Sequence, residues 1–460
     1  MLPTPPAPSP KPRVVLVAPD VVGARMAGPG LRFAEIAQQL ATVADVTLAV
    51  GIEGSDASAL RGRGFDVVAY TGRDELIELL SAHDVAFCQL IDEEAVTAAQ
   101  RAGCRFIFDL YNALPAEAIG AERIGGFDTQ PQMDDVFRDV LRFFRFALRT
   151  GSYFVTSNER QRDFWIGYMI SAEALLPSDL RGRTPDEVIG LCPFGMDDGE
   201  PVSDRRGIRD RFGIPETDLV LLWAGGIWDW FDAETPIRAV ARLRQRGVAA
   251  HLVFYGTTHP NAAIGRPTAV TRAMDAAAEL GVLGDGVHFI EGWVPASERA
   301  DYLLDADAAV STHKESFETR YAFRTRILDH FWASLPSIVS EGDWFAEYIA
   351  EHGLGEVVPY ADVDATVAAI ERLQDPAARE AVRRRVSAVR EDWRWASTTA
   401  ELVRVVAHWQ DTLVPRPVEP PPVAVGSSET PSVRPGPVSR LRFRLSRTVA
   451  GSVYRRLRRR

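Results

Sequence analysis

Short apolar runs alternate with segments of helical periodicity along most of the chain, and this alternation restricts the fold more than any other feature. In the first half the apolar runs are typical of buried strands, and they lie at 13–18, 46–50, 66–70, 85–89, 105–110 and 153–157. Helical segments lie between them, notably at 33–41, 75–81 and 134–148. Strands that alternate with helices predict a parallel sheet covered by helices on both faces.

The second half of the chain repeats this plan. Strands are expected at 219–223, 251–255, 287–290, 308–311 and 337–339, and helices at 234–244, 272–280, 364–373, 377–390 and 398–409. Each half opens with a strand, a glycine-containing loop and a helix. The predicted fold class is therefore α/β, with two Rossmann-like domains that face each other across a cleft and with disordered termini.

Local composition divides the chain further. The proline-rich lead at 1–12 is expected to be disordered, and a proline-rich segment at 415–437 to be a flexible linker. The other predicted units are an N-terminal domain at 13–195, a C-terminal domain at 196–395, a helix that packs back at 396–414 and a basic amphipathic tail at 438–460.

The composition excludes several classes of protein. Three widely spaced cysteines (Cys88, Cys104 and Cys192) form neither a zinc signature nor a disulfide framework, which favours a reducing cytoplasm. No apolar run approaches the ~20 residues of a transmembrane helix. Only two of the 52 basic residues are lysine, so a single arginine is weak evidence of a site.

Charge is distributed unevenly. The net charge is −11, but residues 438–460 carry nine arginines and no acid, so the rest of the chain carries −20. An acidic body argues against a nucleic-acid partner. The tail interleaves apolar residues with its arginines, which favours a helix on an anionic membrane surface over a disordered tail. The predicted location is cytoplasmic, peripheral on the inner face of the membrane.

The stretch 311–345 holds the strongest site candidates. It reads as the end of a strand, a charged loop, a helix and another strand, and ligands bind beyond the carboxyl ends of strands in such units. Arg324 and Arg326 lie where the helix begins and suit a phosphate or pyrophosphate. Asp329, one turn on, could accept hydrogen bonds from a sugar hydroxyl. Alternatively, these arginines pair with Glu318 or other nearby carboxylates.

Three further positions lie near expected strand ends. Gly28 and Gly30 separate the first strand from the first helix, where a ligand can approach the backbone, although a plain turn is an equal alternative. Gly226 and Trp228 occupy the equivalent loop of the second half, where the tryptophan could stack on a base or simply pack. Asp109 ends a strand, where it could serve chemistry or cap the following turn.

The order of these motifs resembles the retaining GT-B glycosyltransferases, specifically the family-four (group 1) enzymes, over residues 13–410. The segments that carry the resemblance are GPG at 28–30, PFGM at 193–196, VHFIEGWV at 287–294, ADAAVS at 306–311 and RILDHFWASLPSIV at 326–339. The resemblance implies that the second half binds a nucleotide-sugar and the first half an acceptor, which would be a glycan or a lipid-linked molecule.

The resemblance also implies roles for single residues. Asp329 matches the acidic residue that holds the nucleotide ribose, and Arg326 falls where many members carry a basic residue for the diphosphate. Gly28 and Gly30 match the loop that approaches donor and acceptor. Asp109 loosely matches a polar group near the transferred sugar.

Two departures from the family pattern shift these roles. The family's paired glutamates, eight positions apart, are absent, because the position eight before Asp329 is Tyr321; Glu318 or Glu315 could substitute. The basic residues that many members carry after the first C-terminal strand are missing as well. Diphosphate binding would then depend on Arg324 and Arg326.

These observations lead to one hypothesis and two rivals. The hypothesis is a hexosyl- or related glycosyltransferase that uses a nucleoside diphosphate sugar as donor with retention, in cell-envelope or extracellular polysaccharide or glycolipid synthesis. The rivals are a nucleotide-sugar epimerase and a catalytically inactive scaffold subunit that binds a sugar nucleotide. Asp305 and Asp307 form a DxD pair, but they immediately precede a buried strand and are expected to turn or cap the chain. No cofactor and no essential metal are expected.

Overall fold

The computed structural model describes residues 11–23, 26–52, 54–120, 129–180, 182–258, 267–292 and 294–420. The predictions for the basic tail at 438–460, for most of the proline-rich lead and for most of the linker lie outside the described residues. None of the helices in the described ranges combines the length and apolar character that a membrane span requires.

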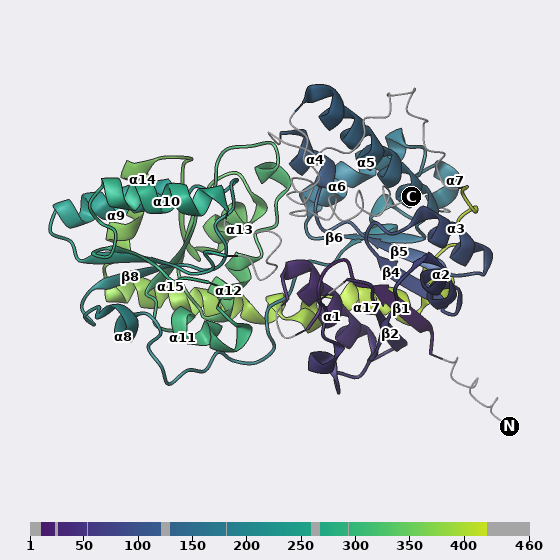
Figure 1. The fold of residues 1–460 in the computed structure, drawn as a ribbon, viewed down its shortest axis with the longest axis horizontal. Coiled ribbons are helices and arrows are strands. Elements are labelled where there is room, and N and C mark those ends of the chain that lie inside the picture. Colours follow the sequence, from purple (N-terminus) through teal and green to yellow (C-terminus); the bar gives the residue numbers. More distant parts are fainter. Residues whose placement is uncertain are drawn as a thin grey trace, which may run out of the picture.

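Seven parallel strands form the sheet of the N-terminal domain, in the order β3-β2-β1-β4-β5-β6-β7 (Figure 1). The strands are β1 (Arg13–Val17), β2 (Asp45–Val50), β3 (Asp66–Ala69), β4 (Val85–Cys88), β5 (Arg105–Asp109), β6 (Tyr153–Thr156) and β7 (Ile189–Leu191). The helices are α1 (Gly28–Leu40), α2 (Arg73–Ser81), α3 (Glu93–Arg101), α4 (Leu114–Ile119), α5 (Gln130–Thr150), α6 (Glu159–Ser171) and α7 (Pro177–Leu180).

Six parallel strands form the sheet of the C-terminal domain, in the order β10-β9-β8-β11-β12-β13. They are β8 (Leu219–Trp223), β9 (Ala250–Phe254), β10 (Val287–Phe289), β11 (Ala308–Ser311), β12 (Ser337–Ser340) and β13 (Gly355–Val358). The helices are α8 (Arg209–Phe212), α9 (Glu234–Gln245), α10 (Thr268–Glu279), α11 (Arg299–Leu303), α12 (Arg326–Trp332), α13 (Trp344–His352), α14 (Val363–Arg372) and α15 (Pro376–Val389).

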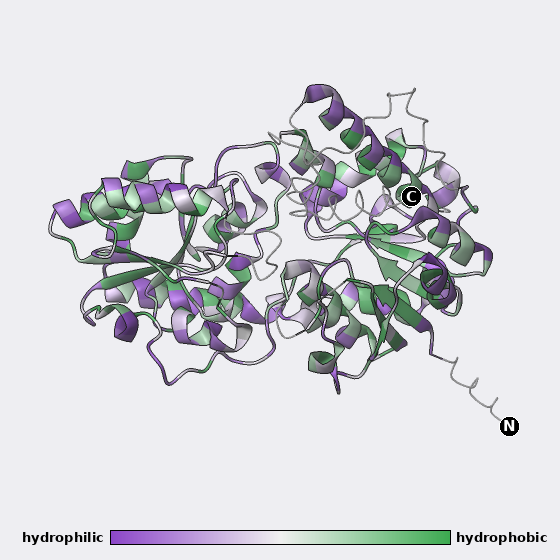
Figure 2. Cartoon of the chain, viewed as in Figure 1, coloured by the Kyte–Doolittle hydropathy of each residue, from purple (hydrophilic) through white to green (hydrophobic). Residues whose placement is uncertain are grey.

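Apolar burial accounts for both layered domains. The central strands β1 and β8 are almost entirely shielded from solvent, and the predicted inner face of α1 is buried. Figure 2 shows the strands as hydrophobic ribbons at the centre of each domain, with hydrophilic residues on the outer helices. A parallel strand that is buried on both faces requires helices on both sides of its sheet. The predicted α/β fold of two Rossmann-like domains is confirmed.

The chain passes between the domains twice, and the two passages lie side by side. Met196, on the way out, pairs with Arg394, on the way back, and Met196 N–H donates to the carbonyl of Trp393 at 2.7 Å. A Cβ at Gly195 would lie 2.6 Å from the Cα of Trp395, so this approach requires glycine. The returning chain then packs on the N-terminal domain, where Glu401 accepts a hydrogen bond from Tyr153 at 2.8 Å.

The last predicted helix is broken into pieces. The segment 398–409 was expected to be continuous, but it contains the end of α16 (Trp395–Thr398), all of α17 (Ala400–Ala407) and the start of α18 (Trp409–Thr412). The Thr399 hydroxyl donates to the carbonyl of Trp395 at 2.6 Å, and His408 has φ −114°. Threonine side chains that bond to the backbone compete with regular helix geometry, which hydrophobic periodicity does not register.

Candidate functional site

The carboxyl ends of β8, β11 and β12 bring the strongest candidates of the C-terminal domain together. Gly226 lies in the loop after β8, and the charged segment after β11 leads through a short helical turn (Thr319–Tyr321) to α12. Arg326 is the first residue of α12, and Arg324 lies two residues before it. These loops occupy the sheet edge where ligands bind in open α/β folds.

Arg326 carries a positive charge that makes no ion pair with a carboxylate of the described residues. Its Nη2 donates to the carbonyl of Gly226 at 2.6 Å, and its guanidinium lies 3.9 Å from the ring centroid of Phe231. Within the described ranges Arg326 makes no ion pair, and its buried Nη1 has no hydrogen-bond partner. Burial, and then the charge of Arg324, lower the pKa of Arg326. A guanidinium stays protonated at neutral pH, so Arg326 keeps its positive charge and a buried N–H that can donate to a ligand.

Arg324 is arranged differently, because carboxylates already hold it. It donates from Nη1 and Nη2 to the two oxygens of Glu318, at 2.9 and 2.8 Å, and its Nε lies 3.8 Å from the carboxylate of Asp343. The pairing with Glu318 that the sequence left open is therefore present. Asp343 also caps α13 by accepting from the backbone N–H of Ala346 at 2.7 Å. Arg324 and Glu318 thus fix the loop between β11 and α12.

Asp329 lies one turn beyond Arg326 and is paired with an arginine that the sequence did not single out. Arg299, from α11, donates to the Asp329 carboxylate at 2.9 Å. Its guanidinium also stacks over Trp332 at 5.4 Å. Burial raises the pKa of Asp329 although the charge of Arg299 opposes it. Nothing in the local sequence around Arg299 distinguishes it from the many other arginines.

In the N-terminal domain, Asp109 is held inside the protein by a second missed residue, Arg32. The Arg32 guanidinium donates to both carboxylate oxygens of Asp109 at 2.8 Å, and its Nη2 donates to the carbonyl of Cys192 at 2.7 Å. It also lies 4.8 Å from the ring centroid of Phe194. This pair ties α1 to the ends of β5 and β7. Both oxygens of Asp109, the carboxylate that was expected near the transferred sugar, therefore already accept from Arg32.

The two glycines in the first turn of α1, Gly28 and Gly30, differ in their surroundings. A Cβ at Gly30 would lie 2.1 Å from the carbonyl oxygen of Val21, so the backbone packs there too closely for any side chain. Gly28 begins α1, and a Cβ there would lie 3.8 Å from the ring of Phe194. Gly30 therefore allows α1 to pack closely on the backbone of Val21, whereas Gly28 lies beside the passage between the domains.

Trp228 stacks on Trp230 in the loop after β8. The ring centroids are 5.8 Å apart with an interplanar angle of 19°, and Trp230 is 38% exposed. Lys314, in the loop after β11, donates from its backbone N–H to the carbonyl of Trp230 at 3.1 Å. The loops after β8 and β11 therefore support each other, with an aromatic pair at their edge.

The loop that carries Glu318 and Arg324 also touches the N-terminal domain. Arg160, near the start of α6, donates to the carbonyls of Gly342 at 2.8 Å and Arg320 at 3.3 Å, and it forms an ion pair with Glu347. Phe194 packs on Phe323 with centroids 6.3 Å apart. The candidate residues of the second domain therefore lie next to the first.

Glu117, on α4, faces this junction from the N-terminal domain, and sequence reasoning missed it. Burial, and then the charge of Glu318, raise the pKa of Glu117 to about 7, while Arg324 opposes the shift. Asn112 donates a long hydrogen bond to its carboxylate at 3.5 Å. Carboxylates from both domains thus share one region, a contact that chain position alone does not reveal.

Asp305 and Asp307 turn and anchor the chain, as expected from the sequence. Asp305 accepts from the backbone N–H groups of Ile208 and Arg209 at 2.9 and 2.7 Å. Asp307 accepts from Val220 N–H and from the Arg209 side chain, both at 2.8 Å. Within the described ranges, no three His, Cys, Asp or Glu side chains gather as a metal site would require.

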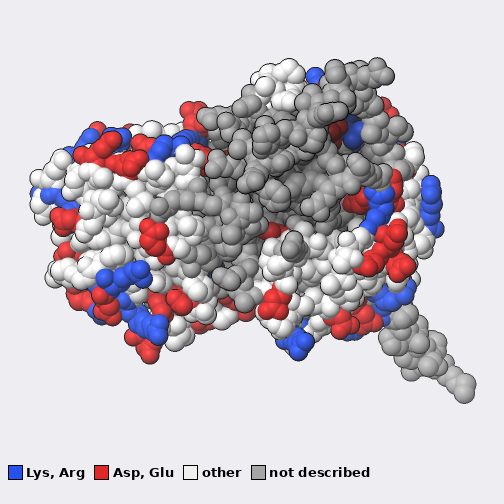
Figure 3. All heavy atoms as spheres, viewed as in Figure 1, with Lys and Arg blue, Asp and Glu red and all other residues white. Residues whose placement is uncertain are grey.

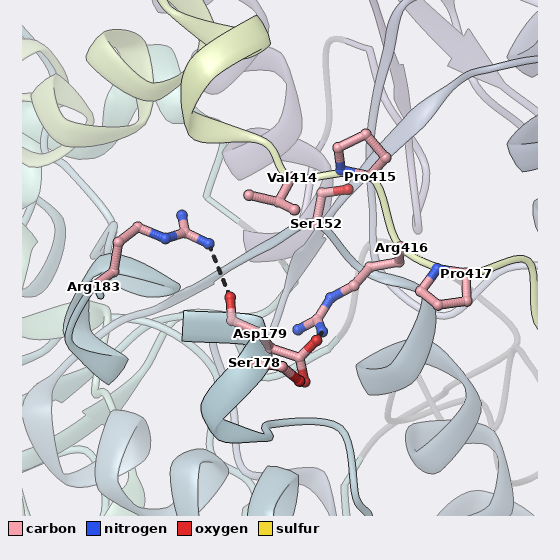
Figure 4. A pocket seen from close by; sticks show the side chains of 8 residues that line it. All are labelled: Ser152, Ser178, Asp179, Arg183, Val414, Pro415, Arg416 and Pro417. Carbon is pink, nitrogen blue, oxygen red and sulfur yellow. Dashed lines mark hydrogen bonds and ion pairs between the residues drawn. The ribbon is translucent and has the colours of Figure 1, made fainter. Parts of the chain in front are cut away.

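A cavity of about 330 Å³ lies at the opposite edge of the N-terminal sheet, beside Ser152 at the start of β6 (Figure 4). The returning segment crosses it, and Arg416 forms an ion pair with Asp179 at 2.6 Å. Arg183 lines the same space and donates to the carbonyl of Thr412 at 3.2 Å. These contacts anchor the end of the described chain, away from the strand ends that carry the candidates.

Charged side chains of both signs are interspersed over the visible face of the C-terminal domain (Figure 3). No single-sign surface marks that face as a partner site for a polyanion. The arginines at the strand ends are instead embedded among aromatic rings and carboxylates, as in a site for a small ligand.

Comparison with known proteins supports the expected relationship. Residues 218–375 match the family model described as Glycosyl transferases group 1, which agrees with the predicted resemblance to group 1 enzymes for this part of the chain. A search of functionally curated proteins gave no match.

Solved structures share the fold over most of the chain at low sequence identity. Anabaena HepE, solved with UDP and glucose, has a TM-score of 0.63 and 12% identity, and the match covers 86% of this chain and all of HepE. WaaG, a glycosyltransferase involved in lipopolysaccharide biosynthesis, has a TM-score of 0.59 and 16% identity over 85% of this chain and 99% of WaaG. Sucrose-phosphate synthase from Thermosynechococcus elongatus has a TM-score of 0.58 and 16% identity over 87% of this chain and all of the synthase.

Proposed function

We propose that this chain, whose C-terminal domain matches the group 1 glycosyltransferase family model, transfers a sugar from a nucleoside diphosphate sugar to an acceptor hydroxyl with retention at the anomeric carbon. The observation that carries the proposal is Arg326, which makes no ion pair with any described residue and donates to the carbonyl of Gly226 after β8. The structure of HepE with UDP and glucose supports the class of donor.

The charges of the site suit the chemistry of this reaction. Departure of a nucleoside diphosphate builds negative charge on the leaving phosphate, and a fixed cation aimed at that charge stabilises the transition state. Arg326 would supply that cation, while Arg324, held by Glu318, would position the loop. Asp329, oriented by Arg299, would accept hydrogen bonds from the ribose. The acceptor hydroxyl would attack from the leaving-group side, so no strong base is required.

The N-terminal domain would bind the acceptor, a glycan or a lipid-linked molecule. We place the enzyme in the cytoplasm, in the synthesis of cell-envelope or extracellular polysaccharide or glycolipid, with the arginine-rich tail at 438–460 on the inner face of the membrane. WaaG's involvement in lipopolysaccharide biosynthesis supports this context. Contact between the domains would exclude water and limit hydrolysis of the donor.

Donor screening followed by two substitutions tests the proposal. UDP, GDP, ADP, CDP and dTDP are compared for thermal stabilisation, because a bound ligand raises stability by mass action. With the matching sugar nucleotide, Arg326→Ala should lower kcat/KM by about 100-fold or more, the usual effect of removing one transition-state charge contact, with little loss of stability. Arg238→Ala, which removes an exposed ion pair with Glu234, serves as the control.

The same assays separate the rival functions. If Arg324→Ala and Arg326→Ala both keep near-normal turnover, the assignment is wrong. Conversion of the donor without an acceptor would indicate an epimerase instead. Tight nucleotide binding without any donor cleavage would indicate a scaffold subunit, and the anomeric configuration of the product, read by NMR, tests retention.

A further inference from the structure

Tyr255 directly follows β9 and carries a buried hydroxyl. The next residue, Gly256, lies against the loop after β8, since a Cβ there would be 3.0 Å from the carbonyl carbon of Gly225. Tyr255 is only 4% exposed, and its ring packs edge-on against Tyr302 with centroids 5.8 Å apart. Within the described ranges its Oη has no hydrogen-bond partner. The charges that act on this hydroxyl belong to Asp329, Arg299 and Arg326. Tyr255 therefore adjoins the group of residues to which donor binding is assigned.

An unpartnered hydroxyl at this position is energetically unfavourable. Burying a polar group without a hydrogen bond destabilises the folded state, and most buried polar groups in folded proteins have partners. The ring alone would fill the same space, so packing against Tyr302 does not explain the hydroxyl. A ligand atom that accepts a hydrogen bond from this hydroxyl would explain its presence.

Two neighbouring groups also lack a hydrogen-bond partner among the described residues, and all three groups can donate a hydrogen bond. Among the residues that the structure describes, Arg326 Nη1 and Arg299 Nε are buried without hydrogen-bond partners, like Tyr255 Oη. The carboxylate among them, Asp329, already accepts from Arg299 Nη1 at 2.9 Å. Arg299 also forms an ion pair with Asp197 at 3.4 Å, so the cluster is marked by its unpartnered donors and not by its net charge. Such a cluster of donors suits a ligand rich in anionic oxygen atoms.

We propose that the Tyr255 hydroxyl donates a hydrogen bond to a phosphate oxygen of the nucleoside diphosphate, alongside Arg326. The inference rests on the proposed function and adds a neutral donor to its site. Burial, and then the charge of Asp329, raise the pKa of Tyr255 above its ordinary value, so the hydroxyl keeps its proton at neutral pH. A protonated phenol complements the guanidinium without adding charge.

Tyr255→Phe tests this role because it removes one oxygen atom and keeps the ring. The unliganded variant should unfold at the same temperature as the parent or higher, since an unpartnered buried hydroxyl has been removed. Binding of the nucleoside diphosphate chosen by the donor screen should weaken by about ten-fold to one hundred-fold, as for a hydrogen bond to a charged group. Inorganic pyrophosphate should lose affinity in the same direction.

Tyr302→Phe is the matched control, because it removes the hydroxyl of the packing partner and leaves Tyr255 intact. It should bind the nucleoside diphosphate like the parent. Equal affinity in the parent and in Tyr255→Phe would overturn the inference while the proposed function stands. Loss of nucleoside diphosphate affinity without loss of pyrophosphate affinity would overturn the assignment to phosphate. If the parent binds none of the nucleoside diphosphates, both the inference and the proposed function fail.

Discussion

Arg32 and Asp109 form a bidentate ion pair in the N-terminal domain, with both N–H···O distances at 2.8 Å and neither side chain exposed. The pair joins α1 to the end of β5, and Arg32 reaches on to the carbonyl of Cys192 after β7. Phe194, which packs against Arg32, touches Phe323 in the other domain. The ion pair therefore supports the surface on which the domains meet.

Asp109→Ala should destabilise the protein strongly. Removing one partner of a buried pair leaves an uncompensated charge and costs about 3–5 kcal/mol. Urea denaturation of the variant and the parent measures the difference. Asp135→Ala, which breaks an ion pair with side chains 76% and 69% exposed, should cost under about 1 kcal/mol. A stable Asp109→Ala protein that has lost turnover would instead assign Asp109 to the chemistry.

Asp329→Asn should separate nucleoside recognition from phosphate recognition. If Asp329 accepts from the ribose, the amide substitution weakens binding of a nucleoside diphosphate by about ten-fold, the cost of a hydrogen bond to a charged group. Inorganic pyrophosphate should bind as it does to the parent, whereas Arg326→Ala should weaken both ligands. Isothermal titration calorimetry measures each affinity. Equal losses for nucleoside diphosphate and pyrophosphate would contradict the ribose role.

The sequence predicts the strands well where apolar runs are continuous. β8 and β11 occupy the predicted residues 219–223 and 308–311, because each run follows an aspartate and is wholly buried. β13 was not predicted, since Gly355 and Glu356 open a half-buried edge strand with little apolar signal. Local pattern thus suffices for the buried central strands and for the edge strands β3 and β10, and it misses the edge strand β13, which lacks a continuous apolar run.

The site was harder to predict than the fold. Arg324 and Glu318 are six residues apart, so their pairing could be foreseen as an alternative. Arg32 and Asp109 are 77 residues apart, and nothing local distinguishes Arg32 in a chain with so many arginines. The charge of Glu318 acts on Glu117 only because the two domains are in contact. Contacts across the sheet or between domains depend on topology, which periodicity does not specify.

Glu117→Gln should flatten the dependence of stability on pH. Burial raises the pKa of Glu117 to about 7, whereas the unfolded chain releases this proton near pH 4.5. Between these values the folded state binds more protons, so the free energy of unfolding falls as pH rises through this window. The glutamine variant lacks this proton and should lose less stability between pH 5 and 8.

Chemical denaturation of the parent, Glu117→Gln and the exposed control Glu380→Gln at several pH values measures this effect. Burial also raises the pKa of Asp343 to about 6. The free energy of unfolding should therefore still fall with rising pH in all three proteins. Identical curves for the parent and Glu117→Gln would contradict the prediction.

Arg160→Ala should loosen the contact between the domains. Arg160 donates to two carbonyls of the C-terminal domain, at 2.8 and 3.3 Å, so its removal leaves both without this partner. We expect a larger radius of gyration in small-angle X-ray scattering and an unchanged far-ultraviolet circular dichroism spectrum. Arg162→Ala, two residues along, removes an ion pair with Asp186 inside the N-terminal domain and is the control. An increase of the same size in both variants would contradict a specific role for Arg160.

Deleting residues 436–460 should abolish association with anionic vesicles. The tail carries nine arginines and no acid, and each arginine near an anionic surface contributes about 1 kcal/mol. Flotation with phosphatidylglycerol-containing liposomes measures binding, and vesicles of phosphatidylcholine alone are the control because they lack the surface charge. The full chain should float with the anionic vesicles at low salt. It should dissociate from them at high salt, because screening weakens the electrostatic attraction. Unchanged vesicle binding after the deletion would contradict the membrane role, and unchanged turnover on a soluble acceptor would place the tail outside the chemistry.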